Sequence, residues 1–197
     1  MEQRSRRAAS VAVILAGVLA VIIAVVGAFN VGQRANATDD ASSANTAPSA
    51  GRGVGPSGQP LPRFVSLKSD KVNVRRGPSS DHQVAWVYSR RNLPVEIIAE
   101  FENWRRIRDS DGEEGWVYHS LLSSRRTVLV SPWKTGQTVM MVQQASDGSR
   151  PVAKVESGVL GVIEQCTGQW CRVEAGGYSG WLPQNMLWGV YPGEKIE

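Results

Sequence analysis

The 197-residue sequence predicts an all-β fold, and three observations lead to this prediction. Residues 64–191 fall into short runs rich in Val, Ile, Tyr and Trp, which turn residues separate; this spacing is typical of a small barrel or sandwich. The same region has no convincing helical periodicity. The segment NWRRIRDSDGEEGWVYHSLL at 103–122 returns loosely as QWCRVEAGGYSGWLPQNML at 169–187. Such self-similarity indicates a duplicated supersecondary unit.

The first copy can be followed strand by strand. Residues 71–75 alternate with period two and stop at Gly77-Pro78. Further strands are expected at 84–88, 95–99, 104–108 and 115–118, divided by polar breaks or turns at 89–92, 102–103 and 109–112. The last of these is an Asp-Gly turn of the kind that joins hairpin strands. A single 3₁₀ turn at 120–122 closes the unit.

The second copy has segments that correspond to those of the first, in the same order. Its segments at 159–165, 170–173 and 180–182 correspond to 93–99, 104–107 and 115–117, and Gly176-Gly177 stands for the Asp-Gly turn. Each copy has about 60 residues, which is near the lower limit for a chain that folds alone. We therefore expect the two copies to pack together, with Trp133 of the linking segment SPWK (131–134) buried between them.

The N-terminal part predicts export from the cytoplasm. A basic flank at 1–10 contains Arg4, Arg6 and Arg7, and 19 uncharged, mostly apolar residues follow at 11–29. About 20 residues of helix span a bilayer core, and flanking arginines favour the cytoplasmic side. The alternative is a signal segment cleaved near Ala37, after the small-x-small sequence Ala35-Asn36-Ala37. The length of the apolar run favours an uncleaved inner-membrane anchor, which places the rest of the chain in the periplasm.

A linker at 30–60 separates this segment from the repeats. Its part TDDASSANTAPSAGRGVGPSGQP (38–60) has one Val and no aromatic residue. Such a composition buries too little apolar surface to offset ordering entropy, so it predicts a disordered tether.

The charge of the chain is unevenly distributed. Residues 1–37 have four Arg and one Glu, whereas the remainder has 18 basic and 17 acidic residues, so nothing favours a nucleic-acid partner. Residues 63–126 carry 12 basic against 9 acidic side chains, and residues 127–197 carry 5 against 6. The excess in the first copy is either a solvated surface with local ion pairs or an attraction to anionic lipid or to acidic wall groups.

Four segments of the first copy carry a family resemblance: VNVRRGPS (72–79), PVEII (94–98), NWRRIR (103–108) and DGEEGWVYHSLL (111–122). Together they resemble a bacterial SH3-like (SH3b) domain along 64–124. The second copy keeps the Trp170 strand and Gly180-Trp181, but TVMMV (138–142) stands where VNVRRGPS would be, so it resembles a degenerate copy. We call 61–126 unit one and 127–197 unit two.

The order of further segments, RR (125–126), SPWK and LWGVYP (187–192), is similar to a group of exported tandem SH3-like proteins of alphaproteobacteria. The resemblance implies a five-stranded, partly open β-barrel in each unit. It also implies a non-catalytic role, commonly the recognition of peptides or peptidoglycan in the envelope.

A ligand groove is expected on unit one. Strand alternation puts Trp104 and Arg106 on the face opposite the core residue Ile107. The resemblance places an aromatic groove there, and aromatic grooves suit extended peptides. Further candidate wall residues are Tyr88, Trp86, Tyr118 and Arg75; the alternative is that these aromatic residues complete a small core.

Structural roles are expected for Gly115, Trp116, Trp170, Gly180 and Trp181. The glycines allow a close backbone approach, so that the tryptophan after each one packs beside the neighbouring strand.

Cys166 and Cys171 flank a Gly-centred turn, TGQW, which would place them on opposite strands at a separation that suits a disulfide. An oxidising periplasm permits the bond; buried thiols and a catalytic or metal-binding role are the alternatives. No metal-ligand spacing or cofactor motif is present in the sequence.

A thiol hydrolase of the cell wall needs a histidine within reach of its cysteine. His82 and His119 belong to unit one and both cysteines to unit two. The sequence therefore predicts a non-catalytic binding or scaffold module of the cell envelope that recognises peptidoglycan or peptide segments. A protein–protein adaptor without wall binding is the alternative, and a hydrolase is disfavoured.

Overall fold

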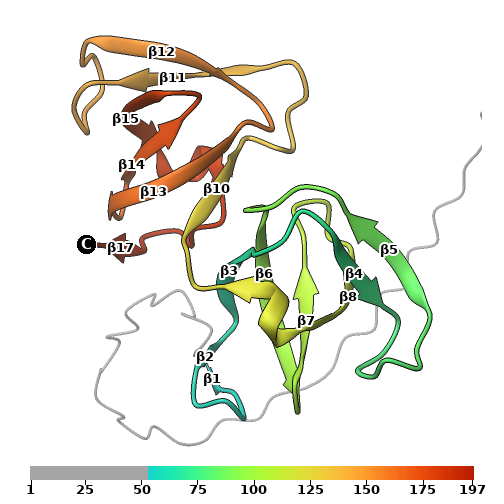
Figure 1. Cartoon of the computed structure of the whole chain (residues 1–197). Helices are drawn as coiled ribbons and strands as arrows, with labels where there is room; N and C mark the ends of the chain where they lie inside the picture. Colours follow the sequence, from blue (N-terminus) through green and yellow to red (C-terminus); the bar gives the residue numbers. More distant parts are fainter. Residues whose placement is uncertain (1–52) are drawn as a thin grey trace, which may run out of the picture. The chain divides into compact units, whose positions relative to one another are not determined.

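The computed structural model describes residues 53–197, which form strands and two short 3₁₀ turns without an α-helix among them (Figure 1). The predicted all-β fold is therefore confirmed. The basic flank, the apolar segment at 11–29 and most of the predicted linker lie outside the described residues. Within residues 53–197 no helix has the length and apolar character needed to cross a membrane.

Unit one is a seven-stranded antiparallel sheet in the order β5-β4-β8-β7-β6-β3-β9. The strands are β3 (Arg63–Leu67), β4 (Val72–Arg75), β5 (Val84–Tyr88), β6 (Pro94–Phe101), β7 (Trp104–Arg108), β8 (Glu114–Tyr118) and β9 (Leu122–Ser123). The 3₁₀ turn η1 (His119–Leu121) precedes β9, one residue earlier than the sequence predicts.

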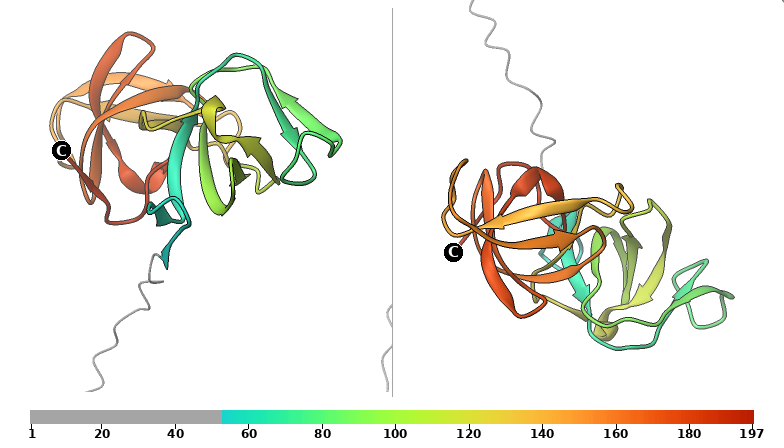
Figure 2. Two further views of the ribbon diagram at one scale, coloured as in Figure 1. Left: turned by 60° about the horizontal axis from the view of Figure 1, so that its bottom comes forward. Right: turned by 90° about the horizontal axis from the view of Figure 1, so that it is seen from above.

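Unit two repeats this order as β12-β11-β15-β14-β13-β10-β16. Its strands are β10 (Thr127–Val130), β11 (Thr138–Val142), β12 (Pro151–Glu156), β13 (Leu160–Thr167), β14 (Trp170–Ala175), β15 (Tyr178–Pro183) and β16 (Leu187–Trp188), with η2 (Gln184–Met186) before β16. An extra strand, β17 (Lys195–Ile196), pairs with β13. In both views of Figure 2 the strands of each unit form a separate, curved group. The duplication is thus complete strand for strand, although one segment of unit two departs from the family pattern.

Each unit has its own hydrophobic core, as the strand alternation predicts. In β4, Val72 and Val74 are fully buried and Asn73 between them is exposed. Ile107 and Val117 of the neighbouring strands complete this side of the core in unit one. In unit two, Met141 and Leu182 stand at the positions of Val74 and Val117, and both are fully buried.

Gly115 and Gly180 lie where β8 and β15 cross over β4 and β11. A Cβ atom at Gly115 would lie 2.3 Å from Val74 Cγ1, and one at Gly180 would lie 2.9 Å from the carbonyl oxygen of Val142. Both positions therefore require glycine, and the predicted close backbone approach is confirmed.

Cys166 and Cys171 form the predicted disulfide. They are cross-strand partners of β13 and β14, their Cα atoms lie 4.1 Å apart, and the bond closes the turn at 167–169. No other cysteine exists in the chain, so it has no free thiol.

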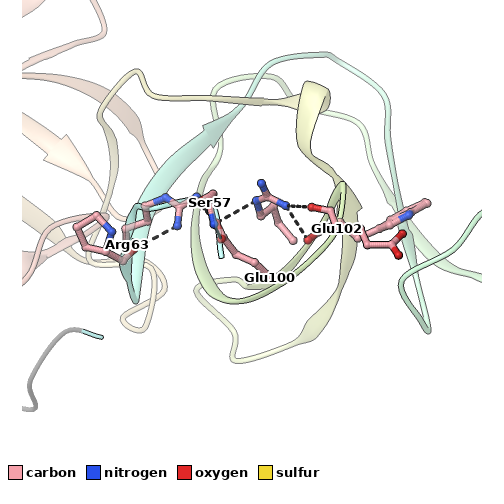
Figure 3. Close-up of polar contacts among 7 residues, drawn as sticks. Ser57, Arg63, Glu100 and Glu102 are labelled. Carbon is pink, nitrogen blue, oxygen red and sulfur yellow. Dashed lines mark hydrogen bonds and ion pairs between the residues drawn. The ribbon is translucent and has the colours of Figure 1, made fainter. Parts of the chain in front are cut away.

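The predicted disordered linker, 30–60, extends too far at its C-terminal end, because its last residues are ordered. Residues 53–61 form a hairpin in which β1 (Gly53–Val54) pairs with β2 (Pro60–Leu61). Figure 3 shows Glu100 of β6 reaching this hairpin. Its carboxylate accepts hydrogen bonds from the Ser57 N–H (2.9 Å), the Ser57 hydroxyl (2.8 Å) and Arg63 Nη2 (2.7 Å). Sequence composition missed this hairpin because its contacts are polar and 43 residues distant.

Aromatic packing joins the two units, which belong to one compact body, Thr46–Glu197. The ring of Phe64 on β3 contacts Trp188 edge-on at 5.1 Å and Tyr191 at 4.7 Å between centroids. The indole N–H of Trp188 donates to the Pro94 carbonyl at 3.4 Å. Thr127, the first residue of unit two, donates to the Asn92 carbonyl at 2.7 Å. The expectation that the units pack together is confirmed.

The expected burial of Trp133 between the units is wrong. Its side chain is 50% exposed. Ser131 has a left-handed backbone (φ 37°) and accepts a hydrogen bond from the Lys134 N–H, so the tryptophan sits on a tight turn after β10. Phe64, Trp188 and Tyr191 fill the place between the units instead.

Candidate ligand-binding cleft

A cleft of about 820 Å³ lies mainly on unit two, beside the seam with unit one. Five aromatic side chains line it: Phe64, Trp133, Trp170, Trp188 and Tyr191. The polar lining residues are Glu96, Arg108, Asp147, Gln169, Gln184 and Asn185. An apolar hollow with a few polar groups is the usual form of a ligand site.

Two tryptophans present their surface to this cleft. Trp170 begins β14 inside the segment that the Cys166–Cys171 disulfide closes, and it is half-buried. Its cross-strand partner is Pro183, the last residue of β15, which also lines the cleft. Trp133 reaches the cleft from its turn after β10. A flat, rigid wall of this kind offers a large contact area at low entropic cost.

The amide groups differ in how far they are already engaged. Gln184 is buried; its Nε2 donates to the Glu194 carbonyl at 2.7 Å, and its Oε1 accepts from the Gly193 N–H at 3.1 Å. This residue therefore holds the C-terminal segment in place. Gln169 and Asn185 are exposed at the cleft, so their amides can bond to a ligand.

A charged group closes the unit-one side of the cleft. Glu96 on β6 is 3% exposed and accepts hydrogen bonds from Arg108 Nε (3.0 Å) and from the Tyr191 hydroxyl (2.9 Å). The hydrogen bond to Glu96 raises the pKa of the Arg108 guanidinium. Because Arg108 and Tyr191 come from different units, this network fixes the geometry of the cleft across the seam.

Among the described residues that line the cleft there is no cysteine, histidine, serine or lysine. Within residues 53–197 no cluster of three His, Cys, Asp or Glu side chains is arranged to hold a metal ion. The lining residues that are present offer aromatic packing, hydrogen bonding and the charged side chains of Glu96, Arg108 and Asp147.

Four of the six predicted groove residues share the outer face of unit one. Trp104 and Tyr118 are cross-strand partners whose rings meet edge-on at 5.4 Å. Two strand positions away, Trp116 pairs with both Arg106 and Arg75. Arg106 forms an ion pair with Glu114 at 2.7 Å, and Arg75 Nη1 donates to the His82 carbonyl at 2.6 Å.

The other two residues, Trp86 and Tyr88, face the core. They are partners of the buried Val74 and Val72, so they point inward from the edge strand β5. Tyr88 donates a 2.7 Å hydrogen bond to Asp109. Burial and then this hydrogen bond raise the pKa of Tyr88 well above its usual range. The structure thus supports the alternative interpretation of these two residues, in which they complete a small core.

The sequence interpretation missed the cleft because it gave Trp170 a structural role. Trp170 and Trp104 begin equivalent strands, and their partners on the next strand are Pro183 and Tyr118. In unit one the Tyr118 ring packs on the tryptophan, whereas in unit two a proline stands at that place and the cleft lies beside it. The signal was the exchange of tyrosine for proline at equivalent positions. Trp181, the counterpart of Trp116, pairs with Val142 and Arg172 and does not line the cleft.

Comparison with known proteins identifies both units. The family described as "Bacterial SH3 domain" matches residues 68–124 and 135–189. A search of curated proteins finds no similar sequence.

Three solved structures are similar at low identity. NlpC2 from Trichomonas vaginalis is 12% identical with a TM-score of 0.29, over 64% of this chain and 48% of that one. NlpC1 from the same organism is 14% identical with a TM-score of 0.28, over 64% and 45%. The endolysin LysPBC5 CBD is 16% identical with a TM-score of 0.26, over 64% and 91%. This chain spans less than half the length of the two Trichomonas proteins.

Proposed function

Because the chain belongs to the bacterial SH3 domain family in both of its units, we propose that it is a non-catalytic binding protein of the bacterial cell envelope whose ligand is peptidoglycan. The observation that carries the proposal is the aromatic cleft at Trp170 and Trp133. Peptidoglycan combines sugar rings with short peptides. Tryptophan faces pack on the rings, and the exposed amides of Gln169 and Asn185 match peptide N–H and carbonyl groups.

The cysteines support a location outside the cytoplasm. Disulfides persist in oxidising compartments and are rare in the cytosol, and Cys166 and Cys171 form one. The apolar segment at 11–29 supports the same side of the membrane. We place the anchor in the inner membrane and both units in the periplasm; release after cleavage near Ala37 would leave the same units there.

A binding role is favoured over wall hydrolysis by the state of the cysteines. A thiol hydrolase needs a thiolate beside its base, and both cysteines of this chain are consumed by the disulfide. The lining of the cleft offers contact area and hydrogen bonds but no nucleophile of the serine, cysteine or lysine type.

The test is retention of residues 46–197 on purified peptidoglycan sacculi, measured by co-sedimentation. These residues form one compact body, so they suit the experiment. We expect Trp170→Ala to weaken binding about tenfold or more, as the loss of a central aromatic anchor does. Trp104→Ala, at the equivalent position of unit one, is the matched control and should bind normally.

Unchanged retention of the Trp170→Ala protein would reject the cleft. Loss of retention only in Trp104→Ala would return the site to the groove predicted on unit one. A protein that does not sediment with sacculi at all, but co-purifies with one envelope protein, would favour the adaptor.

A further inference from the structure

An exposed row of aromatic side chains crosses the outer face of unit one. Phe101, Trp104 and Tyr118 are successive cross-strand partners on β6, β7 and β8. Phe101 is 50% exposed and Tyr118 38% exposed. Neighbouring strands lie about 4.8 Å apart, so the three side chains form one strip about 10 Å across. We call these three residues the aromatic strip.

The strip differs from the other exposed apolar side chains of the described residues. Single exposed apolar residues are normal on protein surfaces. Of the others, Val54 lies on β1, Val84 and Val87 on β5, Trp133 on the turn after β10, Met140 and Val152 on the β11–β12 hairpin, and Tyr178 at the start of β15. None of these forms an aromatic row across three adjacent strands. The strip is therefore the surface of unit one for which we seek a binding partner.

The strip lies at the end of unit one where the N-terminal chain enters. Glu100, the residue before Phe101, holds the hairpin at 53–61 through Ser57 and Arg63 (Figure 3). Successive residues of a strand point to opposite faces, so the hairpin covers one face of β6 and Phe101 projects from the other. Val54 of the hairpin is 75% exposed near this end. Glu100, which binds the N-terminal hairpin, and Phe101, which belongs to the strip, are thus neighbours on β6.

The carboxylate of Glu100, which binds the hairpin at 53–61, is ionised. Its side chain is 1% exposed and lies 3.1 Å from Arg105 Nε and 2.7 Å from Arg63 Nη2. Burial raises the pKa of Glu100, but the hydrogen bonds from Ser57 and Arg63 and the charge of Arg105 outweigh it and lower the pKa to about 2. The carboxylate is therefore charged at neutral pH, as its ion pairs with Arg63 and Arg105 require.

We infer that the aromatic strip docks on the surface of an anionic lipid bilayer, the one that the N-terminal segment of this chain is proposed to span. The inference rests on the anchoring part of the proposed function and is independent of the cleft. Residues 30–52 separate the apolar segment from the hairpin, and 23 residues span at most about 80 Å. The strip is consequently always within reach of the membrane surface.

The chemistry of the strip suits that surface. Trp and Tyr concentrate at membrane–water interfaces, where one part of the ring system is apolar and another is polar. Arg75 and Arg106 flank the strip, with Glu102 and Glu114 as the nearby acids, and residues 63–126 carry 12 basic against 9 acidic side chains. At the strip itself the two arginines are matched by the two glutamates, so the attraction to anionic headgroups rests on the net positive charge of residues 63–126 as a whole. Unit two, with 5 basic and 6 acidic residues, offers no such surplus.

The experiment uses the full chain, with the segment at 11–29 intact, reconstituted in vesicles that contain a bromine-labelled phospholipid. Bromine quenches the fluorescence of tryptophans that touch the bilayer. In vesicles with phosphatidylglycerol we expect quenching that Trp104→Phe lowers strongly and that the control Trp133→Phe, which replaces another exposed tryptophan, leaves unchanged. Phe101→Ser should lower the docking equilibrium constant about fivefold, and Tyr178→Ser should not.

Each other outcome overturns the inference. Quenching that persists unchanged in Trp104→Phe would place a different tryptophan at the bilayer. Equal quenching in purely zwitterionic vesicles would remove the role of charge. A concentration-dependent dimer without quenching would show that the strip contacts a second copy of the chain and not the bilayer. Sacculus binding by residues 46–197 carrying Phe101→Ser stays normal in every case, so the two proposals fail separately.

Discussion

Unit one and unit two have the same strand order, yet they present different surfaces at the same place in the fold. Trp104 and Trp170 begin equivalent strands. In unit one the tryptophan is covered by the edge of the Tyr118 ring and belongs to an exposed aromatic strip. In unit two its partner is Pro183, and a cleft of about 820 Å³ lies beside it. The two units therefore share their strand order, whereas the cross-strand partner of this tryptophan differs between them.

The units also differ in what fixes the loops near these tryptophans. The turn before Trp170 is closed by a disulfide, whereas the turn before Trp104 has Glu102 in a left-handed backbone conformation and no covalent bond. Unit one instead has the Glu100 contact that holds the N-terminal hairpin. In unit two the disulfide thus provides a covalent constraint beside the cleft that unit one does not have at the equivalent turn.

The largest expected effect on stability comes from removing the aromatic packing between the two units. This packing lets residues of unit one form part of the cleft on unit two. Phe64 is 7% exposed between Trp188 and Tyr191. We expect Phe64→Ala to lower the free energy of unfolding by about 3 kcal/mol, the usual cost of removing a buried aromatic ring. Denaturant unfolding of residues 46–197 measures it. A loss below about 1 kcal/mol would mean that the seam contributes little.

The disulfide should have the next largest effect, and it should be confined to unit two. Replacing Cys166 and Cys171 together with serine removes a cross-link that closes a very short loop, so we expect a loss of roughly 2 kcal/mol. The turn that places Trp170 loses its closure, and sacculus binding should weaken with it. Calorimetry and co-sedimentation of the double variant test both effects. Unchanged binding would show that the rim is rigid without the bond.

A pH-dependent effect should belong to unit one. The folded-state pKa of Glu100 is about 2, below its ordinary value of 4.5. A depressed pKa stabilises the fold above the unfolded pKa, and the contribution disappears as the pH falls from about 5 toward 2. Wild-type stability should therefore fall more steeply over this window than that of Glu100→Gln. Parallel slopes in acid titrations followed by circular dichroism would contradict the assignment.

Local patterns were sufficient for the fold but not for the site. Alternation identified Ile107 as a core residue, and the Gly-centred turn identified the disulfide, because both depend on neighbouring positions. The orientation of Trp86 depends on how an edge strand folds over Gly115, which no local pattern contains. The same holds for Trp133, which the packing of Phe64 and Trp188 excludes from the seam.

Residues distant in sequence also account for what composition missed. Ser57 lies in a polar segment whose composition is typical of a linker, and its N–H and hydroxyl bind Glu100, 43 residues later. Tyr191 reaches Glu96 across 95 positions and so helps to build the back of the cleft. Such pairings follow from the relative placement of two units, whereas the sequence pattern describes each unit separately.

The most direct test of the account exchanges the residue that distinguishes the two surfaces. Pro183→Tyr in residues 46–197 gives unit two the aromatic partner that unit one has at Tyr118. The tyrosine ring should pack over Trp170 and occupy the cleft. We predict a protein with unchanged circular dichroism that no longer sediments with peptidoglycan sacculi. A Pro183→Tyr protein that binds sacculi as well as the wild type would contradict the assignment of the ligand site to this cleft.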